Sequence, residues 1–308
     1  MTDQKTTVDY LRFRTQAEPL EVLEAIRPMF GGYGSHLSVK SLQKGALGFE
    51  RALQINMADM PLMRLDFGGD SQRGWVRADM TGKACEWVQD WSAIDSLEAL
   101  PDAQIRRLDL ALTTWDGEVT HDRVVEAYEA GRFKTGGRPP ELRTITSSND
   151  RAGRTCYVGV REKSDKFFRA YEKGFEMAGK IRSPGQITHI DGKAIEDIYR
   201  CEVELKAVTR PITWDVIERR DQYFAGSYPF SADILPDVEA DILMRRKERA
   251  PQMDLQAALR NCRIQMGPTL YTALKAYKGD ITAVWDLIVG DHDSESLLES
   301  GVLLVDHD

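Results

Sequence analysis

The sequence has few cysteines and no long apolar run, and both shortages restrict what the protein can be. Its four cysteines are far apart and form no Cys-x-x-Cys pair; they are Cys85, Cys156, Cys201 and Cys262. We therefore expect neither a zinc site nor a disulfide framework, and a reducing cytoplasm is the simplest setting. No apolar stretch approaches the roughly 18 residues of a membrane-spanning helix, and the N-terminus shows no signal pattern. We expect a cytoplasmic protein without a membrane partner.

Motifs of nucleotide-binding and hydrolytic enzymes are also lacking. The sequence has no Gly-x-Ser-x-Gly elbow, no His-Glu-x-x-His metal site and no complete phosphate-binding loop. The glycine-rich segment 31–34 lacks the lysine and the spacing of a nucleotide site, so we interpret it as an ordinary loop. A metabolic or nucleotide-processing enzyme is therefore the least favoured class of function.

Positive charge is in the minority but is clustered. The chain has 41 Lys and Arg against 49 Asp and Glu, a formal net charge of -8, which disfavours a general nucleic-acid binder. Acidic residues gather at the C-terminus, in 291–308, whereas 151–173 and 245–249 are locally basic. Because binding depends on where the charge lies, we expect moderate and strongly salt-dependent DNA affinity.

The hydrophobic pattern predicts an α+β fold in which helices pack on an antiparallel sheet. Strands are expected at 7–14, 50–56, 62–68, 74–80, within 102–115, and at 142–148, 154–161, 166–173 and 198–208. Helices are expected from Leu20, near Lys83, and at 122–130 and 213–223. We divide the chain into a larger domain, 1–230, and a smaller helical region with an acidic tail, 231–308. No internal repeat is expected.

The segment 153–176 is the most informative part of the chain, because it places Arg and Lys side chains around two tyrosines. It resembles the core motif of the replication initiation factor (Rep-trans) family, the rolling-circle initiators of plasmids and filamentous phages. The matching positions are Gly153, Thr155, Tyr157, Gly159, Arg161, Ser164, Arg169, Tyr171 and Lys173. Three further segments match in order: 8–11, 107–111 and 199–204. The resemblance covers roughly the first 230 residues and implies that 1–230 is a nicking and DNA-binding domain.

Alternation along the expected strands puts the polar side chains on common faces. On 107–113, Arg107 and Asp109 lie opposite three leucines. On 200–207, the polar face holds Arg200, Glu202, Glu204 and Lys206, and on 167–173 it holds Arg169, Tyr171 and Lys173. If these strands join one antiparallel sheet, the polar faces gather on its side away from the core. An ordinary solvent-facing sheet is the alternative.

A surface of this composition suits metal-assisted cleavage of a phosphodiester. Carboxylate oxygens are hard ligands for Mg²⁺ or Mn²⁺, and the candidates are Asp109, then Glu202 and Glu204. The resemblance implies that Tyr171 attacks the DNA phosphate, leaving a 5′-phosphotyrosyl bond and a free 3′-hydroxyl. We expect Arg169, Lys173 and the metal to lower the pKa of this phenol. The expected phosphate contacts are Arg161, Lys163, Lys166, Arg107 and Arg200.

Several alternatives stay open. Tyr157 and Tyr199 are reserve nucleophiles, Arg107 and Asp109 could form only a salt bridge, and the basic residues could simply face water. Thr113 occupies a position where many family members carry a second acid. None of the five histidines forms the His–hydrophobic–His pair of the broader class of tyrosine nickases. A non-catalytic origin-binding or regulatory protein of the same fold is the second hypothesis.

The resemblance also implies partners. These are origin DNA, single-stranded or supercoiled, a host helicase and a second copy of the chain, in the cytoplasm of a bacterial host.

Overall fold

The computed structural model describes residues 4–149, 151–162, 164–181, 187–243 and 255–292. Contacts divide the chain into two units, Met1–Met244 and Arg245–Asp308. No helix among the described residues has the length and apolar character needed to cross a bilayer. The first unit carries the sheet and all the candidate site residues that are described.

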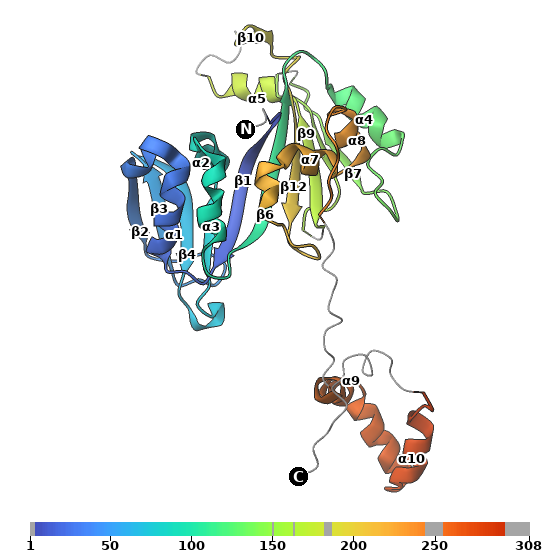
Figure 1. The fold of residues 1–308 in the computed structure, drawn as a ribbon. Coiled ribbons are helices and arrows are strands. Elements are labelled where there is room, and N and C mark those ends of the chain that lie inside the picture. Colours follow the sequence, from blue (N-terminus) through green and yellow to red (C-terminus); the bar gives the residue numbers. More distant parts are fainter. Residues whose placement is uncertain (1–3, 150, 163, 182–186, 244–254, 293–308) are drawn as a thin grey trace. The chain divides into compact units, whose positions relative to one another are not determined.

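The first unit is built on a ten-stranded sheet in the order β2-β3-β4-β5-β1-β6-β12-β9-β8-β7 (Figure 1). Every neighbouring pair of strands is antiparallel. The strands are β1 (Thr6–Thr15), β2 (Leu37–Leu42), β3 (Arg51–Met57), β4 (Met60–Phe67), β5 (Val76–Met80), β6 (Gln104–Thr114), β7 (Leu142–Ile145), β8 (Thr155–Val158), β9 (Lys166–Tyr171) and β12 (Tyr199–Lys206). A hairpin, β10 (His189–Ile190) with β11 (Lys193–Ala194), stands apart from this sheet.

Two halves of the sheet repeat one topology. In the first half β1 is followed by α1 (Pro19–Ile26) and then by β2 to β5, which return to β1 in the order β1-β5-β4-β3-β2. In the second half β6 is followed by α4 (His121–Glu129), and its strands lie in the corresponding order β6-β12-β9-β8-β7. The halves meet where β1 pairs with β6. The strand order is thus repeated, although no internal repeat was seen in the sequence.

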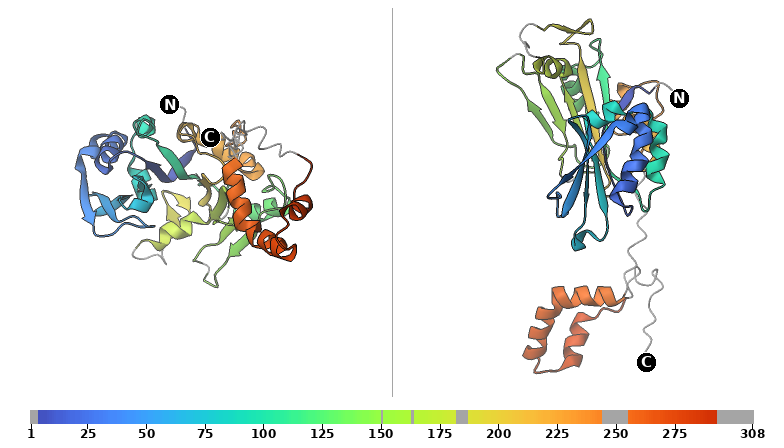
Figure 2. Two further views of the ribbon diagram at one scale, coloured as in Figure 1. Left: turned by 90° about the horizontal axis from the view of Figure 1, so that it is seen from below. Right: turned by 90° about the vertical axis from the view of Figure 1, so that its left-hand side faces the viewer.

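Short helices cover one side of the sheet, as the right-hand view of Figure 2 shows for α1. They are α2 (Gly82–Trp87), α3 (Asp95–Glu98), α4, α6 (Asp215–Glu218), α7 (Arg220–Ala225) and α8 (Pro229–Asp233), with the 3-10 helices η1 (Arg27–His36), η2 (Asp70–Gln72) and η3 (Trp91–Ile94) between strands. Apolar side chains from α1, α3, α4, α6, α7 and α8 join those of one sheet face in a continuous core. One face of the sheet is thus buried in the core. The residues that alternate with these core residues along each strand point to the other face of the sheet.

Local sequence explains where these helices begin. Pro19 starts α1, and Glu18 and Glu21 form a capping box there. Thr120 caps α4 by accepting a hydrogen bond from the backbone of Arg123. The helix expected near Lys83 is α2, which is short and ends at Trp87.

The second unit contains α9 (Leu255–Ala276) and α10 (Ile281–Ile288). Asp280 caps α10 by accepting a hydrogen bond from the backbone of Ala283.

The α+β class with an antiparallel core and a helical C-terminal region is confirmed. The strand β2, the hairpin β10–β11 and α5 (Lys173–Gly179) were not predicted. The contacts within the structure assign 231–243 to the first unit, whereas the domain boundary predicted from the sequence follows residue 230. The functional assignment of the two regions stays a prediction.

Replacing Phe168 by alanine is expected to destabilise the first unit by about 3–5 kcal/mol, since the vacated volume lies inside a packed core. The Phe168 ring is fully buried and lies 4.9 Å from Phe133 and 6.0 Å from Phe230, between ring centroids. Urea unfolding followed by tryptophan fluorescence measures the change. Ile145→Ala, at an exposed position of the edge strand β7, should stay within about 0.5 kcal/mol of the wild type. Equal losses in both variants would contradict the assignment of the core.

Candidate active site on the polar face of the sheet

The register of three strands brings the predicted site residues onto one surface. Glu204 on β12 pairs with Asp109 on β6, and Glu202 pairs with Arg169 on β9. Arg200 pairs with Tyr171. Neighbouring strands lie about 4.8 Å apart, so these side chains are within reach of one another. We call this surface the polar face; it comprises Arg107, Asp109, Arg200, Glu202, Glu204, Lys206, Arg169 and Tyr171.

Tyr171 lies at the end of β9, with its hydroxyl turned to a carboxylate. It donates a hydrogen bond of 2.8 Å to Oε1 of Glu202 and is 6% exposed. The guanidinium carbon of Arg169 lies 4.1 Å from the ring centroid. Lys173, the first residue of α5, donates from Nζ to the hydroxyl at 3.5 Å. The structure therefore places two predicted catalytic side chains, Arg169 and Lys173, beside the third, Tyr171.

The electrostatics of this phenol differ from the expectation. Burial raises the pKa of Tyr171 well above its usual value, and the nearby charge of Glu202 raises it further. Arg200 acts in the opposite direction but does not overcome these two effects. The prediction that surrounding cations lower this pKa is thus wrong for the protein alone, because desolvation outweighs them. Tyr171 is a neutral phenol that has a carboxylate ready to accept its proton.

The two other carboxylates share one guanidinium. Arg107 binds Asp109 through two hydrogen bonds, of 2.8 Å from Nε and 2.6 Å from Nη2. Nη2 of Arg107 also lies 2.9 Å from Oε2 of Glu204. Arg161 approaches the same Glu204 oxygen at 2.7 Å from the other side, and Lys206 lies 3.4 Å from its Oε1. The predicted salt bridge between Arg107 and Asp109 is therefore present, and it extends to Glu204.

Crowding and burial raise the pKa of two of these acids. Burial raises the pKa of Asp109 to about 6, although Arg107 lowers it, and Glu204 and Glu202 add to the increase. Burial also raises the pKa of Glu202, as does the negative charge of Asp9. These carboxylates repel one another and lack full compensation, so an additional cation at this surface would stabilise their charged forms.

The fit of this surface to a metal is partial. Its donors are carboxylate oxygens, which are the right type for Mg²⁺ or Mn²⁺. Among the residues that the structure describes, however, no three acidic, histidine or cysteine side chains stand close enough together to hold an ion. Arg107 lies between Asp109 and Glu204 and would have to give way. Thr113, at the position of the missing acid, stands opposite Arg200 on the neighbouring strand.

The predicted phosphate-contacting residues separate into two groups. Arg107, Arg161 and Arg200 reach carboxylates of the polar face or its margin; Arg200 lies 3.2 Å from Asp9. Lys166 belongs to the opposite face of β9, so it does not share a surface with them. Lys163 lies outside the described residues.

The two reserve tyrosines differ in position. Tyr199 is 1% exposed and belongs to the core, where its hydroxyl has no hydrogen-bond partner among the described residues. Tyr157 pairs with Arg169 across β8 and β9 and so stands on the same side of the sheet as Tyr171. A Tyr199 hydroxyl sealed in the core cannot approach a DNA phosphate without local unfolding.

Sequence reasoning missed the contribution of β1. A register shift between Val8 and Tyr10 sets Asp9 toward Arg200 and places Tyr10 opposite Asp109. The Tyr10 hydroxyl donates to Asp79 at 2.7 Å, and the guanidinium of Arg107 lies 4.4 Å from its ring. The segment 8–11 had been recognised as part of the family pattern, but a bulge cannot be read from alternation.

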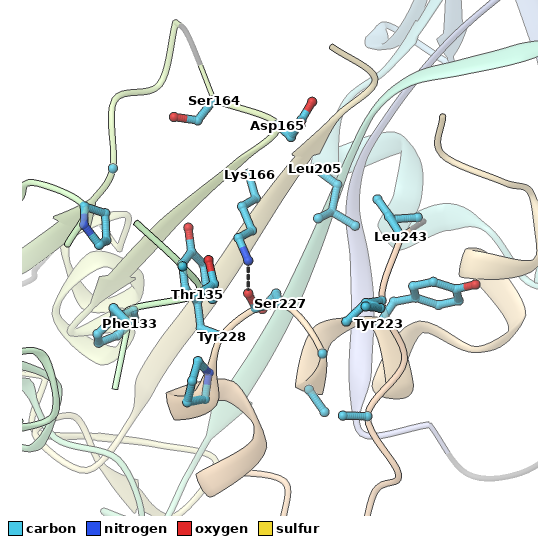
Figure 3. Close-up of a pocket in the computed structure, with 18 of the residues that line it drawn as sticks. Phe133, Thr135, Ser164, Asp165, Lys166, Leu205, Tyr223, Ser227, Tyr228 and Leu243 are labelled. Carbon is cyan, nitrogen blue, oxygen red and sulfur yellow. Dashed lines mark hydrogen bonds between the residues drawn. The ribbon is translucent and has the colours of Figure 1, made fainter. Parts of the chain in front are cut away.

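A cavity of about 620 Å³, shown in Figure 3, has a lining that does not include Tyr171. Its lining includes the core-facing side chains of Lys166 and Leu205, and Nζ of Lys166 donates to the backbone oxygen of Ser227. Burial lowers the pKa of Lys166 to about 8, and Arg210 adds to this effect. The Lys166 side chain therefore lies on the core side of the sheet and does not belong to the polar face.

Replacing Asp109 by asparagine is expected to flatten the dependence of stability on pH. The folded protein keeps the Asp109 proton up to about pH 6, whereas the unfolded chain releases it near pH 3.8, so stability falls as the pH rises through this window. The two units of difference correspond to about 3 kcal/mol. Urea unfolding at several pH values between these limits measures the slope. Asp59→Asn, in an exposed turn, controls for the loss of one charge; identical slopes for both variants would refute the prediction.

Comparisons with known proteins agree with this architecture. The sequence matches the family described as replication initiation factor over residues 103–283, more than half of the chain. A solved rolling circle replication initiator protein from Geobacillus stearothermophilus is similar, with a TM-score of 0.53 and 19% sequence identity. The similarity covers 78% of this chain and 99% of that chain, and it shows a common fold. No curated protein matches the sequence. The family match includes β6, β8, β9 and β12, and the chain belongs to the replication initiation factor family.

Proposed function

We propose that this protein initiates rolling-circle replication by nicking one strand of origin DNA, with Tyr171 as the nucleophile. The observation that carries this proposal is the hydrogen bond of 2.8 Å from the Tyr171 hydroxyl to Glu202, on a surface lined by arginines. A phenol, a proton acceptor and guanidinium groups are the components that a phosphotyrosyl transfer requires. Family membership and the shared fold support the same function.

The reaction begins with attack of the Tyr171 oxygen on the phosphorus of the scissile phosphodiester. The phenolic proton passes to Oε1 of Glu202, which already accepts it in a hydrogen bond. The bond between phosphorus and the 3′ oxygen breaks, and that oxygen takes up a proton from solvent. The products are a 5′-phosphotyrosyl linkage and a free 3′-hydroxyl.

The raised pKa values of the two partners are compatible with this transfer. A phenol whose pKa is raised is not deprotonated in advance, so proton removal accompanies the attack. A carboxylate whose pKa is also raised holds the transferred proton more readily. Arg169 over the Tyr171 ring and Lys173 at its hydroxyl offset the negative charge that develops on the phosphate.

The candidate ligands for Mg²⁺ or Mn²⁺ are the carboxylates of Asp109, Glu202 and Glu204, which among the described residues would have to move closer together to hold an ion. When bound, the ion would polarise the phosphate oxygens and orient the scissile bond for in-line attack. Arg107 would leave its position between Asp109 and Glu204 and become free to contact the DNA backbone. We assign Arg161 and Arg200 to phosphate contacts as well.

The phosphotyrosyl bond conserves the energy of the cleaved phosphodiester, so strand rejoining needs no nucleotide cofactor. The same residues act in the reverse direction. A 3′-hydroxyl attacks the phosphorus and releases its proton to solvent, the bond between phosphorus and the Tyr171 oxygen breaks, and Glu202 returns a proton to the departing phenol. The partner is origin DNA, single-stranded or supercoiled; a host helicase and a homodimer stay expectations from the family. A non-catalytic origin-binding protein is the second candidate, favoured by the position of Arg107 between the carboxylates.

Tyr171→Phe is expected to abolish the covalent protein–DNA adduct while keeping DNA affinity, since only the attacking oxygen is removed. The assay incubates supercoiled and single-stranded origin DNA with the protein and Mg²⁺ or Mn²⁺, then separates SDS-resistant adducts on a gel. Tyr157→Phe is the matched control and should form adduct like the wild type. An adduct that persists in Tyr171→Phe would reject this nucleophile. Binding by the wild type without adduct under either metal would support the non-catalytic alternative.

Glu202→Gln is expected to slow nicking by at least about 100-fold near neutral pH, because an amide cannot accept the phenolic proton. The wild-type rate should fall on the acid side as Glu202 becomes protonated, and the variant should lack this limb. Single-turnover nicking across a pH series measures both effects. Asp233→Asn, which affects an ion pair with Arg132 outside the site, serves as the control. A variant with the wild-type rate and pH profile would remove Glu202 from the mechanism.

A further inference from the structure

A pair of stacked aromatic rings lies beside the candidate site. The ring of Tyr157 on β8 lies 5.7 Å from that of Phe167 on β9, at an interplanar angle of 23°. The guanidinium carbon of Arg143 on β7 lies 5.0 Å from the centre of the Tyr157 ring, and that of Arg161 lies 5.6 Å from the Phe167 ring. Strands β7, β8 and β9 and the turn after β8 thus contribute two aromatic rings and two guanidinium groups to one layer.

A cavity lies beside this layer of rings and guanidinium groups. A cavity of about 310 Å³ is lined by Arg143, Tyr157, Arg161 and Phe167 and by the glycine at position 159. Gly159 has a φ of +99°, which side chains rarely adopt, and a Cβ there would lie 4.0 Å from the Phe167 ring. The positive φ therefore accounts for the glycine, and a Cβ there would make only ordinary van der Waals contact with the Phe167 ring.

The charges around the cavity fit a nucleotide. Arg143 is exposed and forms no ion pair with any described residue, so its charge is available for a phosphate. Arg161 is already paired with Glu204 and is held in place by it. Glu141 and Glu162 line the same cavity and offer acceptors for the exocyclic amino group of a base such as cytosine.

One wall of the cavity, Tyr157, lies next to the proposed nucleophile, whereas Phe167 lies four residues before it on β9. Tyr157 pairs with Arg169, and Tyr171 pairs with Thr155, so the two tyrosines are diagonal neighbours on adjacent strands. Diagonal positions on paired strands are about 7–8 Å apart. A nucleotide adjoining a phosphate at Tyr171 would bring its base to the Tyr157 ring.

We propose that Tyr157, Phe167 and Arg143 form a stacking subsite for one unpaired base of single-stranded DNA, next to the phosphate that Tyr171 attacks. The base lies on the Tyr157 ring in place of the Arg143 guanidinium, which turns to the adjoining phosphate. Aromatic rings and arginine planes bind unpaired bases because each base has an exposed π face, which a duplex hides. The placement beside Tyr171 rests on the proposed function, whereas the stacking itself does not.

The test measures binding of a fluorophore-labelled oligodeoxycytidylate by anisotropy, with every variant made in the full-length Tyr171→Phe protein so that no adduct can form. Tyr157→Ala should weaken binding by about 5- to 150-fold, the usual loss for one base stacked on an aromatic ring. Tyr157→Phe should bind like the parent, because the ring is kept. Tyr33→Ala, at an exposed tyrosine on η1 that packs on Trp87, should also leave affinity unchanged.

Salt dependence separates stacking from charge. Tyr157→Ala should leave the slope of log affinity against log salt unchanged, whereas Arg143→Ala should reduce it by about 0.7, the value for one phosphate contact on a single strand. If Tyr157→Ala fails to fold, Tyr157→Leu keeps an apolar contact with Phe167 without a π face and should show the same loss.

Parental affinity in both Tyr157→Ala and Tyr157→Leu, or an equal loss in Tyr157→Phe, would overturn the subsite. These affinities are measured without chemistry. An absent adduct in the wild type would therefore reject the nicking function and leave the stacking result standing.

Discussion

The antiparallel register of β6, β12 and β9 is the constraint on which the rest of the site depends. It sets Asp109 against Glu204, Glu202 against Arg169, and Arg200 against Tyr171. Since alternate residues face opposite sides, a slip of one residue would send every one of these side chains into the core. The core face fixes the register, because its apolar side chains have no other place to be buried. Burial on one face thus determines the chemistry of the other.

The arginines of the polar face make this crowding of acids tolerable. Arg107 bridges Asp109 and Glu204, and Glu202 receives hydrogen bonds or charge from Tyr171, Arg169 and Arg200. Moving charges out of water is costly, and removal of one partner leaves the other uncompensated. The raised pKa values of Asp109 and Glu202 show that the compensation is incomplete. A surface in this condition favours an approaching cation and keeps a proton acceptor beside the phenol.

Alternation in the sequence was sufficient to place Asp109, Glu202 and Tyr171 on one face, because strand geometry has a period of two. The same period of two puts Lys166 on the core side, so its assignment to the phosphate contacts ignored the alternation. Alternation was insufficient for Asp9, which a bulge turns toward Arg200. The direction of the Tyr171 pKa shift depends on burial by neighbouring elements, which no single strand reveals. The repeated topology was hidden because the order of strands in a sheet leaves no trace in local spacing.

The seam between the two halves has a consequence for how the chain acquires its fold. Strands β2 to β5 pair among themselves and with β1, so the N-terminal half can assemble while the rest is still being synthesised. Until β6 emerges from the ribosome, the opposite edge of β1 presents unsatisfied backbone groups, which is the condition that invites pairing with another nascent copy. When β6, which ends at residue 114, has emerged and pairs with β1, this edge is closed. The same pairing first brings Asp109 beside Tyr10.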